Sequence, residues 1–120
     1  LVGDQPLHLK SVLKETALFD AVGDVLAAGG VVTATGGSAA AMCDPMVDPR
    51  GGAFTLGLGL VTGLALVTEA EGWSPERLHR TRKLANTTFA VLRTGDALVL
   101  TSSGWERVGE PEVHGDLPQM

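Results

Sequence analysis

The sequence predicts a layered α/β fold, in which helices cover both faces of a central sheet. Short apolar runs rich in β-branched residues alternate with segments of helical periodicity, and glycines mark most of the breaks between them. Strands that alternate with helices pair in parallel, because each helix carries the chain back to the starting edge of the sheet. A length of 120 residues suits one domain, so we expect residues 1–120 to form a single domain.

The first forty residues predict the order strand, helix, helix, strand, helix. Residues 1–5 are interpreted as the end of a strand followed by a glycine turn. Apolar residues recur with helical spacing over residues 9–13 and again over residues 18–26, where a glycine pair ends the second helix. The β-branched run over residues 31–35 predicts a buried strand, and an alanine-rich helix begins at Ser38.

The rest of the chain begins with a long loop and continues with strands around one helix. Residues 44–63 are rich in proline and glycine, and long loops of this kind are often functional. Residues 64–67 predict a strand, and Ser74-Pro75-Glu76 predicts the start of a helix that ends near Ala85. Strands are expected over residues 89–92, 97–100 and 104–108. The polar tail over residues 110–120 is expected to be loose.

Composition excludes several classes of function. The net charge of −5 disfavours a phosphate backbone, so we expect no nucleic-acid partner. The single cysteine, Cys43, excludes a disulfide framework and a cysteine-rich zinc site, and its simplest role is a small core residue. We find no apolar run of about 18 residues and no leader, so we expect no membrane span and a cytoplasmic location. The sequence shows no metal cluster and no phosphate loop, so we expect no cofactor.

The break before Ser38 carries the strongest chemical signal. The apolar run reaches Gly36 and Gly37, and a helix restarts at once with only alanine between Ser38 and Met42. A serine on such a tight strand-to-helix turn projects beyond the sheet edge, and small neighbours are needed because the turn is crowded. The pattern therefore indicates a nucleophile elbow. The alternative is a glycine-tipped loop in which Ser38 is an ordinary helix N-cap.

Five motifs follow one another in a characteristic order. They are Gly-Asp-Gln, Gly-Gly-Ser-Ala-Ala-Ala-Met, Asp-Pro-Met-Val-Asp-Pro-Arg-Gly-Gly, Gly-Leu-Gly-Leu-Val and Gly-Asp-Ala-Leu-Val-Leu. In order and spacing they resemble the dipeptidase E and cyanophycinase family of serine peptidases, over residues 2–109. The resemblance implies the three-layer, flavodoxin-like architecture of class I glutamine amidotransferases, of which this chain matches the C-terminal half and is expected to lack the N-terminal one.

The resemblance also implies roles at the turn. Ser38 matches the family's nucleophile in a Gly-x-Ser-Ala-Gly-Ala pattern, in which Ala40 replaces the second glycine. The backbone N–H groups of Gly3 and Ala39 match the oxyanion donors, although Val2 replaces the glycine that precedes Gly3 in the family. Loss of one such donor typically lowers the rate by about a hundredfold or more.

The catalytic base is where this sequence departs from the family. The family's next strand ends in Pro-His-Phe-Asp, whereas here Glu69 stands in the place of the histidine. An ordinary carboxylate, with a pKa of about 4.3, is a poor base for a serine hydroxyl. His79 is expected on a solvated helix face and His114 in the tail. His8, close to the Gly3 turn, remains open as a substitute base.

Three residues of the long loop are further candidates. Asp44 and Asp48 each match the acid that would orient a base, and each also fits the Asp-Pro turn in which it occurs, so both interpretations stay open. Arg50 is a candidate for holding a substrate carboxylate, which suits a family acting on acidic peptides. An exposed surface arginine is the simpler interpretation.

Two hypotheses about function result. The first is a serine peptidase that hydrolyses small or acidic peptides through Ser38. The second is a pseudoenzyme or binding domain that keeps the elbow and has lost its base. The chain is also expected to be a fragment of a longer protein, and a sheet edge left exposed in it would favour a homodimer.

Overall fold

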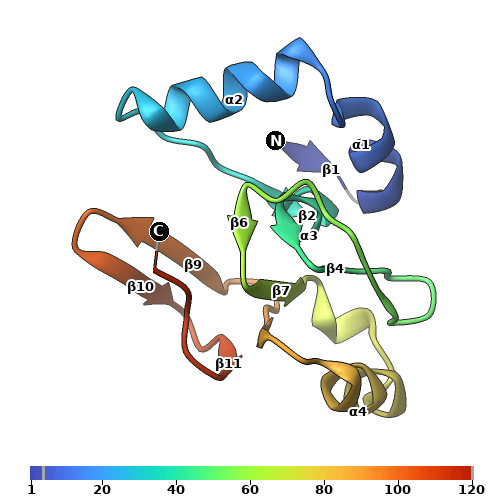
Figure 1. The fold of residues 1–120 in the computed structure, drawn as a ribbon. Coiled ribbons are helices and arrows are strands. Elements are labelled where there is room, and N and C mark those ends of the chain that lie inside the picture. Colours follow the sequence, from blue (N-terminus) through green and yellow to red (C-terminus); the bar gives the residue numbers. More distant parts are fainter. Residues whose placement is uncertain (4, 120) are drawn as a thin grey trace.

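Two parallel strands lie at the centre of the fold. The computed structural model describes residues 1–3 and 5–119, and Figure 1 shows their path. Strand β7 (Leu64–Val67) pairs in parallel with β8 (Thr88–Val91), from Leu64 opposite Thr88 to Val67 opposite Val91. All four residues of β7 are buried, as expected for a strand in parallel pairing that is covered on both faces.

Side chains that alternate along β7 and β8 divide the core into two clusters. One face contributes Val67 and Phe89, and Leu78 of helix α4 (Pro75–Leu84) packs against the cluster that they form. The other face contributes Leu66 and Ala90, which lie with Cys43 in the second cluster. Both faces of the pair are therefore closed by other parts of the chain.

Helix α4 (Pro75–Leu84) connects the two central strands and begins as predicted. The Ser74 hydroxyl accepts a hydrogen bond from the Arg77 N–H at 3.2 Å, and Pro75 occupies the first turn. The hydroxyl of Thr81, a fully buried residue, donates to the Gly52 carbonyl oxygen at 2.9 Å. This bond ties the loop around Gly52 to the helix.

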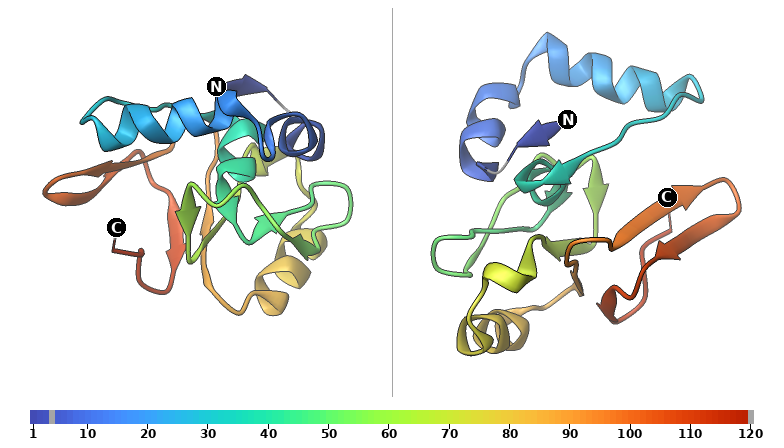
Figure 2. Two further views of the ribbon diagram at one scale, coloured as in Figure 1. Left: turned by 45° about the horizontal axis from the view of Figure 1, so that its top comes forward. Right: turned by 180° about the vertical axis from the view of Figure 1, so that it is seen from behind.

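The N-terminal part of the chain forms a small sheet and three helices. Strand β1 (Val2–Gly3) pairs in parallel with β2 (Thr35–Gly36). The helices are α1 (Pro6–Leu13), α2 (Ala17–Ala27) and α3 (Gly37–Met42). Figures 1 and 2 show α2 at the periphery of the molecule, and none of its residues is buried.

The prediction of a buried strand over residues 31–35 is wrong for most of its length. Only Thr35 of that run belongs to β2, and Val31 is 84% exposed. The β-branched residues favour extended backbone, but burial requires a covering element, and none lies over Val31.

The proline- and glycine-rich segment contains four short strands rather than one continuous loop. Strands β3 (Cys43–Asp44) and β6 (Val61–Thr62) pair in parallel, and β4 (Met46–Val47) pairs with β5 (Phe54–Thr55) in antiparallel fashion. The β4–β5 pair brings residues 48–52 together as its connecting turn.

The C-terminal part is a hairpin followed by an ordered tail. Strands β9 (Ala97–Thr101) and β10 (Gly104–Val108) pair with each other, and β11 (Glu112–His114) pairs with β8. The indole N–H of Trp105 also donates to the Pro118 carbonyl oxygen at 2.8 Å. Residues Glu112–His114 of the tail that was expected to be loose from Glu110 therefore form a strand, and Met120 lies outside the described residues.

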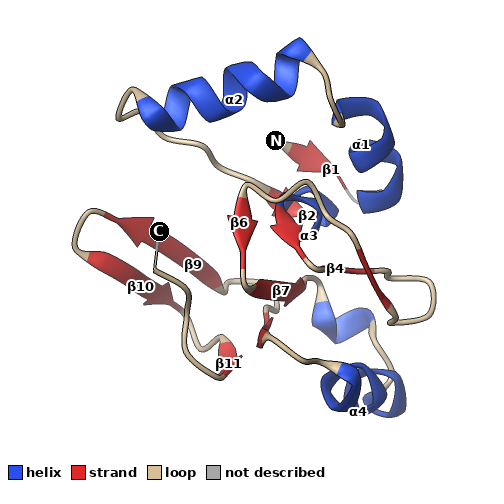
Figure 3. Ribbon diagram, viewed as in Figure 1, coloured by secondary structure: helices blue, strands red, loops and turns tan. Residues whose placement is uncertain are grey.

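The structure is a mixed α/β domain with small sheets and helices, which confirms the predicted class at that level, as Figure 3 makes visible. The strands of the described residues form five sheets of two or three strands. The radius of gyration of 13.6 Å is that of a single compact domain of this length. Among residues 1–3 and 5–119, no helix combines the length and the apolar character needed to cross a membrane.

Candidate functional site

The turn between β2 and α3 has its strained residue at Gly36. This residue has φ 58° and ψ −136°, a conformation that residues with a side chain rarely adopt. A Cβ atom here would lie 2.8 Å from the Gly3 carbonyl oxygen and 3.1 Å from Oε1 of Glu69. The apex of the elbow is thus Gly36, two residues before the serine that the sequence placed at the break.

Ser38 lies inside the first turn of α3 and does not project beyond the sheet edge. It is 1% exposed, and its hydroxyl has no hydrogen-bond partner among the described residues. A Cβ atom on Gly3 would lie 3.3 Å from the Ser38 Oγ, so the hydroxyl adjoins the predicted oxyanion donor. The N-cap alternative is wrong, because Gly36 occupies that position.

Glu69 reaches the same turn from the end of β7. It precedes the 3-10 helix η1 (Ala70–Gly72) and adopts the left-handed conformation, with φ 54° and ψ 43°. This conformation is uncommon for a residue with a side chain and costs about 1–2 kcal/mol. Its exposed carboxylate is the acidic group beside Gly36. The structure therefore brings together Gly3, Gly36, Ser38 and Glu69.

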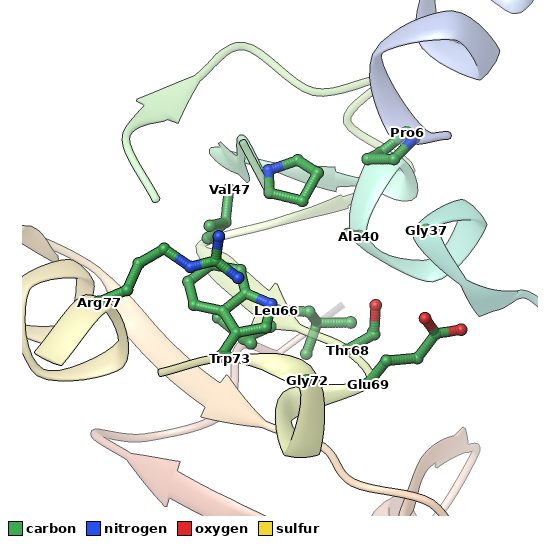
Figure 4. A pocket seen from close by; sticks show the side chains of 12 residues that line it. Pro6, Gly37, Ala40, Val47, Leu66, Thr68, Glu69, Gly72, Trp73 and Arg77 are labelled. Carbon is green, nitrogen blue, oxygen red and sulfur yellow. The ribbon is translucent and has the colours of Figure 1, made fainter. Parts of the chain in front are cut away.

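A pocket of about 220 Å³ opens next to this turn, and Figure 4 shows its side chains. Its walls include Ala40 of α3, Val47 of β4, Leu66 of β7 and the Trp73 indole. Its polar side chains are those of Thr68, Glu69 and Arg77. The exposed lining of the pocket is polar and apolar in about equal parts. A cavity in which a few polar groups converge among apolar side chains is the usual form of a small-molecule site.

Arg77 and Trp73 form one side of this pocket. The guanidinium carbon of Arg77 lies 4.2 Å from the centroid of the Trp73 ring, a favourable cation–π distance. The Nε atom of Arg77 is buried and has no hydrogen-bond partner among the described residues. Neither Trp73 nor Arg77 is among the site residues predicted from the sequence. One feature of the sequence could have identified them. Trp73 lies just before α4 and Arg77 lies in its first turn, a spacing that brings the two side chains together.

Arg50, the predicted substrate-binding residue, forms an ion pair outside the pocket. Its side chain is 77% exposed and pairs with Asp48, with 2.9 Å between a guanidinium nitrogen and Oδ2. The Arg50 backbone N–H also donates to Oδ1 of Asp48 at 2.9 Å. The side-chain hydrogen bond from Arg50 holds the pKa of Asp48 below its ordinary value. Both residues form the turn around Pro49, and neither lines the pocket.

Asp44, the other predicted orienting acid, has a structural role in the loop. Its Oδ1 accepts a hydrogen bond from the Gly57 N–H at 3.1 Å, and its carbonyl oxygen accepts one from Gly63 at 3.1 Å. Asp44 does not line the pocket either. Neither candidate acid therefore joins Glu69 in the lining of the pocket.

The remaining candidates divide between the turn and other regions. Ala39 belongs to the first turn of α3, where backbone N–H groups lack intrahelical acceptors, and its use as an oxyanion donor stays a prediction. Cys43 is buried, and burial raises the pKa of its thiol to about 12, so it is not a thiolate nucleophile. Asp4 of the predicted N-terminal turn lies outside the described residues.

None of the three histidines lines the pocket. His8 is exposed on α1, and His79 lines a separate cavity beside α4. The His114 ring stacks on Phe89 with 6.2 Å between their centroids. Within the described part of the chain, no three His, Cys, Asp or Glu side chains are grouped to hold a metal ion.

Comparisons of this chain with models of protein families, with curated proteins and with solved structures found no match.

Proposed function

We propose that this chain is a dipeptidase E-like domain that binds a small peptide in the pocket beside Gly36 and has lost ordinary serine-peptidase turnover. The proposal includes the three-layer flavodoxin-like architecture that the motif order implies. The observation that supports this proposal most directly is the composition of the turn between β2 and α3. A glycine occupies the strained apex, and the acidic group of Glu69 adjoins it.

Turnover by a serine peptidase needs an accessible hydroxyl and a base that takes up its proton and returns it to the leaving amine. The Ser38 hydroxyl is buried, and the titratable side chains of the pocket are Glu69 and Arg77. A carboxylate is a weak base for this step, and a guanidinium is always protonated. These features favour the second of the two hypotheses derived from the sequence, a domain that binds without hydrolysis.

A retained binding role is supported by the pocket itself. Its apolar walls and its unpaired arginine remain in place although the elbow lacks an exposed nucleophile. A buried guanidinium nitrogen without a partner costs free energy in the unliganded protein, and a ligand carboxylate would recover it. This is the physical reason to propose a ligand site rather than a passive surface hollow.

A fluorophosphonate probe for active-site serines tests the loss of turnover. The wild type is expected to be labelled no more than Ser38→Ala, with folding of both checked by circular dichroism. Labelling of the wild type that disappears in Ser38→Ala would overturn the proposal.

That outcome would establish the first hypothesis, a serine peptidase using Ser38. One observation favours it as the second candidate function. The Ser38 Oγ is unpartnered and adjoins Gly3, the predicted oxyanion donor. A small outward shift of α3 would expose this hydroxyl to a substrate.

A further inference from the structure

We infer that the pocket selects a small zwitterion with an uncharged, apolar body, whose carboxylate pairs with Arg77 and whose ammonium group pairs with Glu69. The inference rests on the proposed use of this pocket as a ligand site. It adds the identity of the two residues that bind the charged groups of the ligand, and the kind of side chain that the ligand has.

Arg77 supplies the site for the carboxylate. It is the cation among the described residues that line the pocket, and it makes no ion pair within the described chain. Its guanidinium lies over the Trp73 ring, as Figure 4 shows, and its stem packs against the loop, because a Cβ on Gly52 would lie 3.5 Å from the Arg77 Cγ. A guanidinium fixed in this way is preorganised for a planar, two-oxygen partner.

Glu69 supplies the site for the ammonium group. Figure 4 shows its carboxylate on the α3 side of the pocket, away from the Arg77 guanidinium, and the Thr68 hydroxyl lies beside it. No hydrogen bond or ion pair from another described side chain occupies this carboxylate. The left-handed backbone at Glu69 turns the chain here and fixes the point from which the carboxylate extends.

The space between the two charges sets the body of the ligand. Val47, Leu66 and Trp73 line it with apolar surface. A second carboxylate on the ligand would find no second cation in this lining and would face Glu69, so acidic side chains are disfavoured. The volume of about 220 Å³ lies below the roughly 300 Å³ at which drug-sized sites begin, which limits the ligand to the size of an amino acid or dipeptide.

Isothermal titration calorimetry of the full chain with glycyl-leucine tests this inference. The comparison ligands are N-acetyl-glycyl-leucine, glycyl-leucinamide and glycyl-glutamate. The first lacks the ammonium charge, the second lacks the carboxylate charge, and the third carries an additional carboxylate. The variants are Arg77→Met and Glu69→Gln, with Arg82→Met and Glu76→Gln as matched controls on exposed positions of α4. Each blocked or acidic ligand is expected to bind about tenfold or more weakly than glycyl-leucine.

A crossed pattern identifies the two contacts. Arg77→Met should weaken glycyl-leucine and no longer distinguish it from glycyl-leucinamide, while it still rejects the acetylated ligand. Glu69→Gln should no longer distinguish glycyl-leucine from the acetylated ligand, while it still rejects glycyl-leucinamide. Both control variants should bind all ligands as the wild type does. The inference is overturned if glycyl-leucine does not bind at millimolar concentration, or if blocking its termini leaves affinity unchanged.

These outcomes are separate from those of the serine-probe experiment. Labelling of Ser38 would refute the proposed loss of turnover and leave the charge selectivity intact. Failure of glycyl-leucine binding without labelling would refute the zwitterion selectivity alone.

Discussion

Replacing Gly36 with alanine is the sharpest test of the elbow geometry. The backbone strain of a side chain at φ 58° and ψ −136° costs about 1–3 kcal/mol. The new Cβ would lie 2.8 Å from the Gly3 carbonyl oxygen, a backbone atom that moves only if the β1–β2 pairing shifts. Such overpacking adds about 1–3 kcal/mol. The expected loss is therefore about 2–6 kcal/mol of unfolding free energy, out of the 5–15 kcal/mol typical of a domain.

Urea unfolding followed by the fluorescence of Trp73 and Trp105 measures this loss. The matched control is Gly23→Ala in α2, where no atom lies within 4 Å of the new Cβ and φ is not positive. Alanine should stabilise that helix by about 0.5–1 kcal/mol relative to glycine. The reasoning is refuted if Gly36→Ala unfolds within about 0.5 kcal/mol of the wild type, a difference usual for neutral surface changes.

Three further predictions follow from the backbone and the titrating groups. Glu69→Gly should be more stable than Glu69→Ala by about 1 kcal/mol in urea unfolding, because glycine adopts the left-handed conformation without strain. Cys43 should react with a disulfide reagent at pH 8 only as fast as the chain opens, because burial raises its pKa to about 12; rapid labelling of the folded protein would contradict its burial. Asp48→Asn should lower stability at pH 7 by less than about 1 kcal/mol. That difference should vanish in unfolding curves as the pH falls through the lowered pKa of Asp48, where the wild type also loses the ionised carboxylate.

Local signals predicted the helices and the central strand well. Helix α4 begins at Pro75 because Ser74 caps it, and this cap depends on residues adjacent in sequence. Strand β7 covers the residues predicted for it, since four consecutive apolar residues suit a strand buried on both faces. Where the determinants lie within a few residues, the sequence was sufficient.

Elements whose burial depends on distant partners were not predictable in this way. Val31 has the β-branched character of a core strand and is 84% exposed, because no other element covers it. The opposite error occurred in the tail, where the short polar strand β11 is held by pairing with β8, more than twenty residues earlier. Sequence patterns report what a segment favours, whereas these outcomes depend on which surface it meets.

The predicted substrate-binding arginine lies outside the pocket for a similar reason. Arg50 pairs with Asp48, two residues away, and neither residue lines the pocket. Arg77 is one of several charged residues on α4, and its sequence neighbours do not distinguish it from the others. Only the fold shows that its first turn faces Trp73 and the cavity.

Gly36 and Glu69 fit one another sterically at the elbow. With glycine at the apex, Oε1 of Glu69 occupies space only 3.1 Å from the position that a Cβ on residue 36 would take. A larger side chain at the apex would force this carboxylate away, and a glutamate in this rotamer would crowd any group placed there. Glycine at position 36 and glutamate at position 69 therefore stabilise the same geometry, in which a carboxylate, rather than a nucleophile with its base, faces the pocket. Substitution of Glu69 by histidine alone would leave this apex without a hydroxyl and Ser38 still buried, so it is not expected to create turnover.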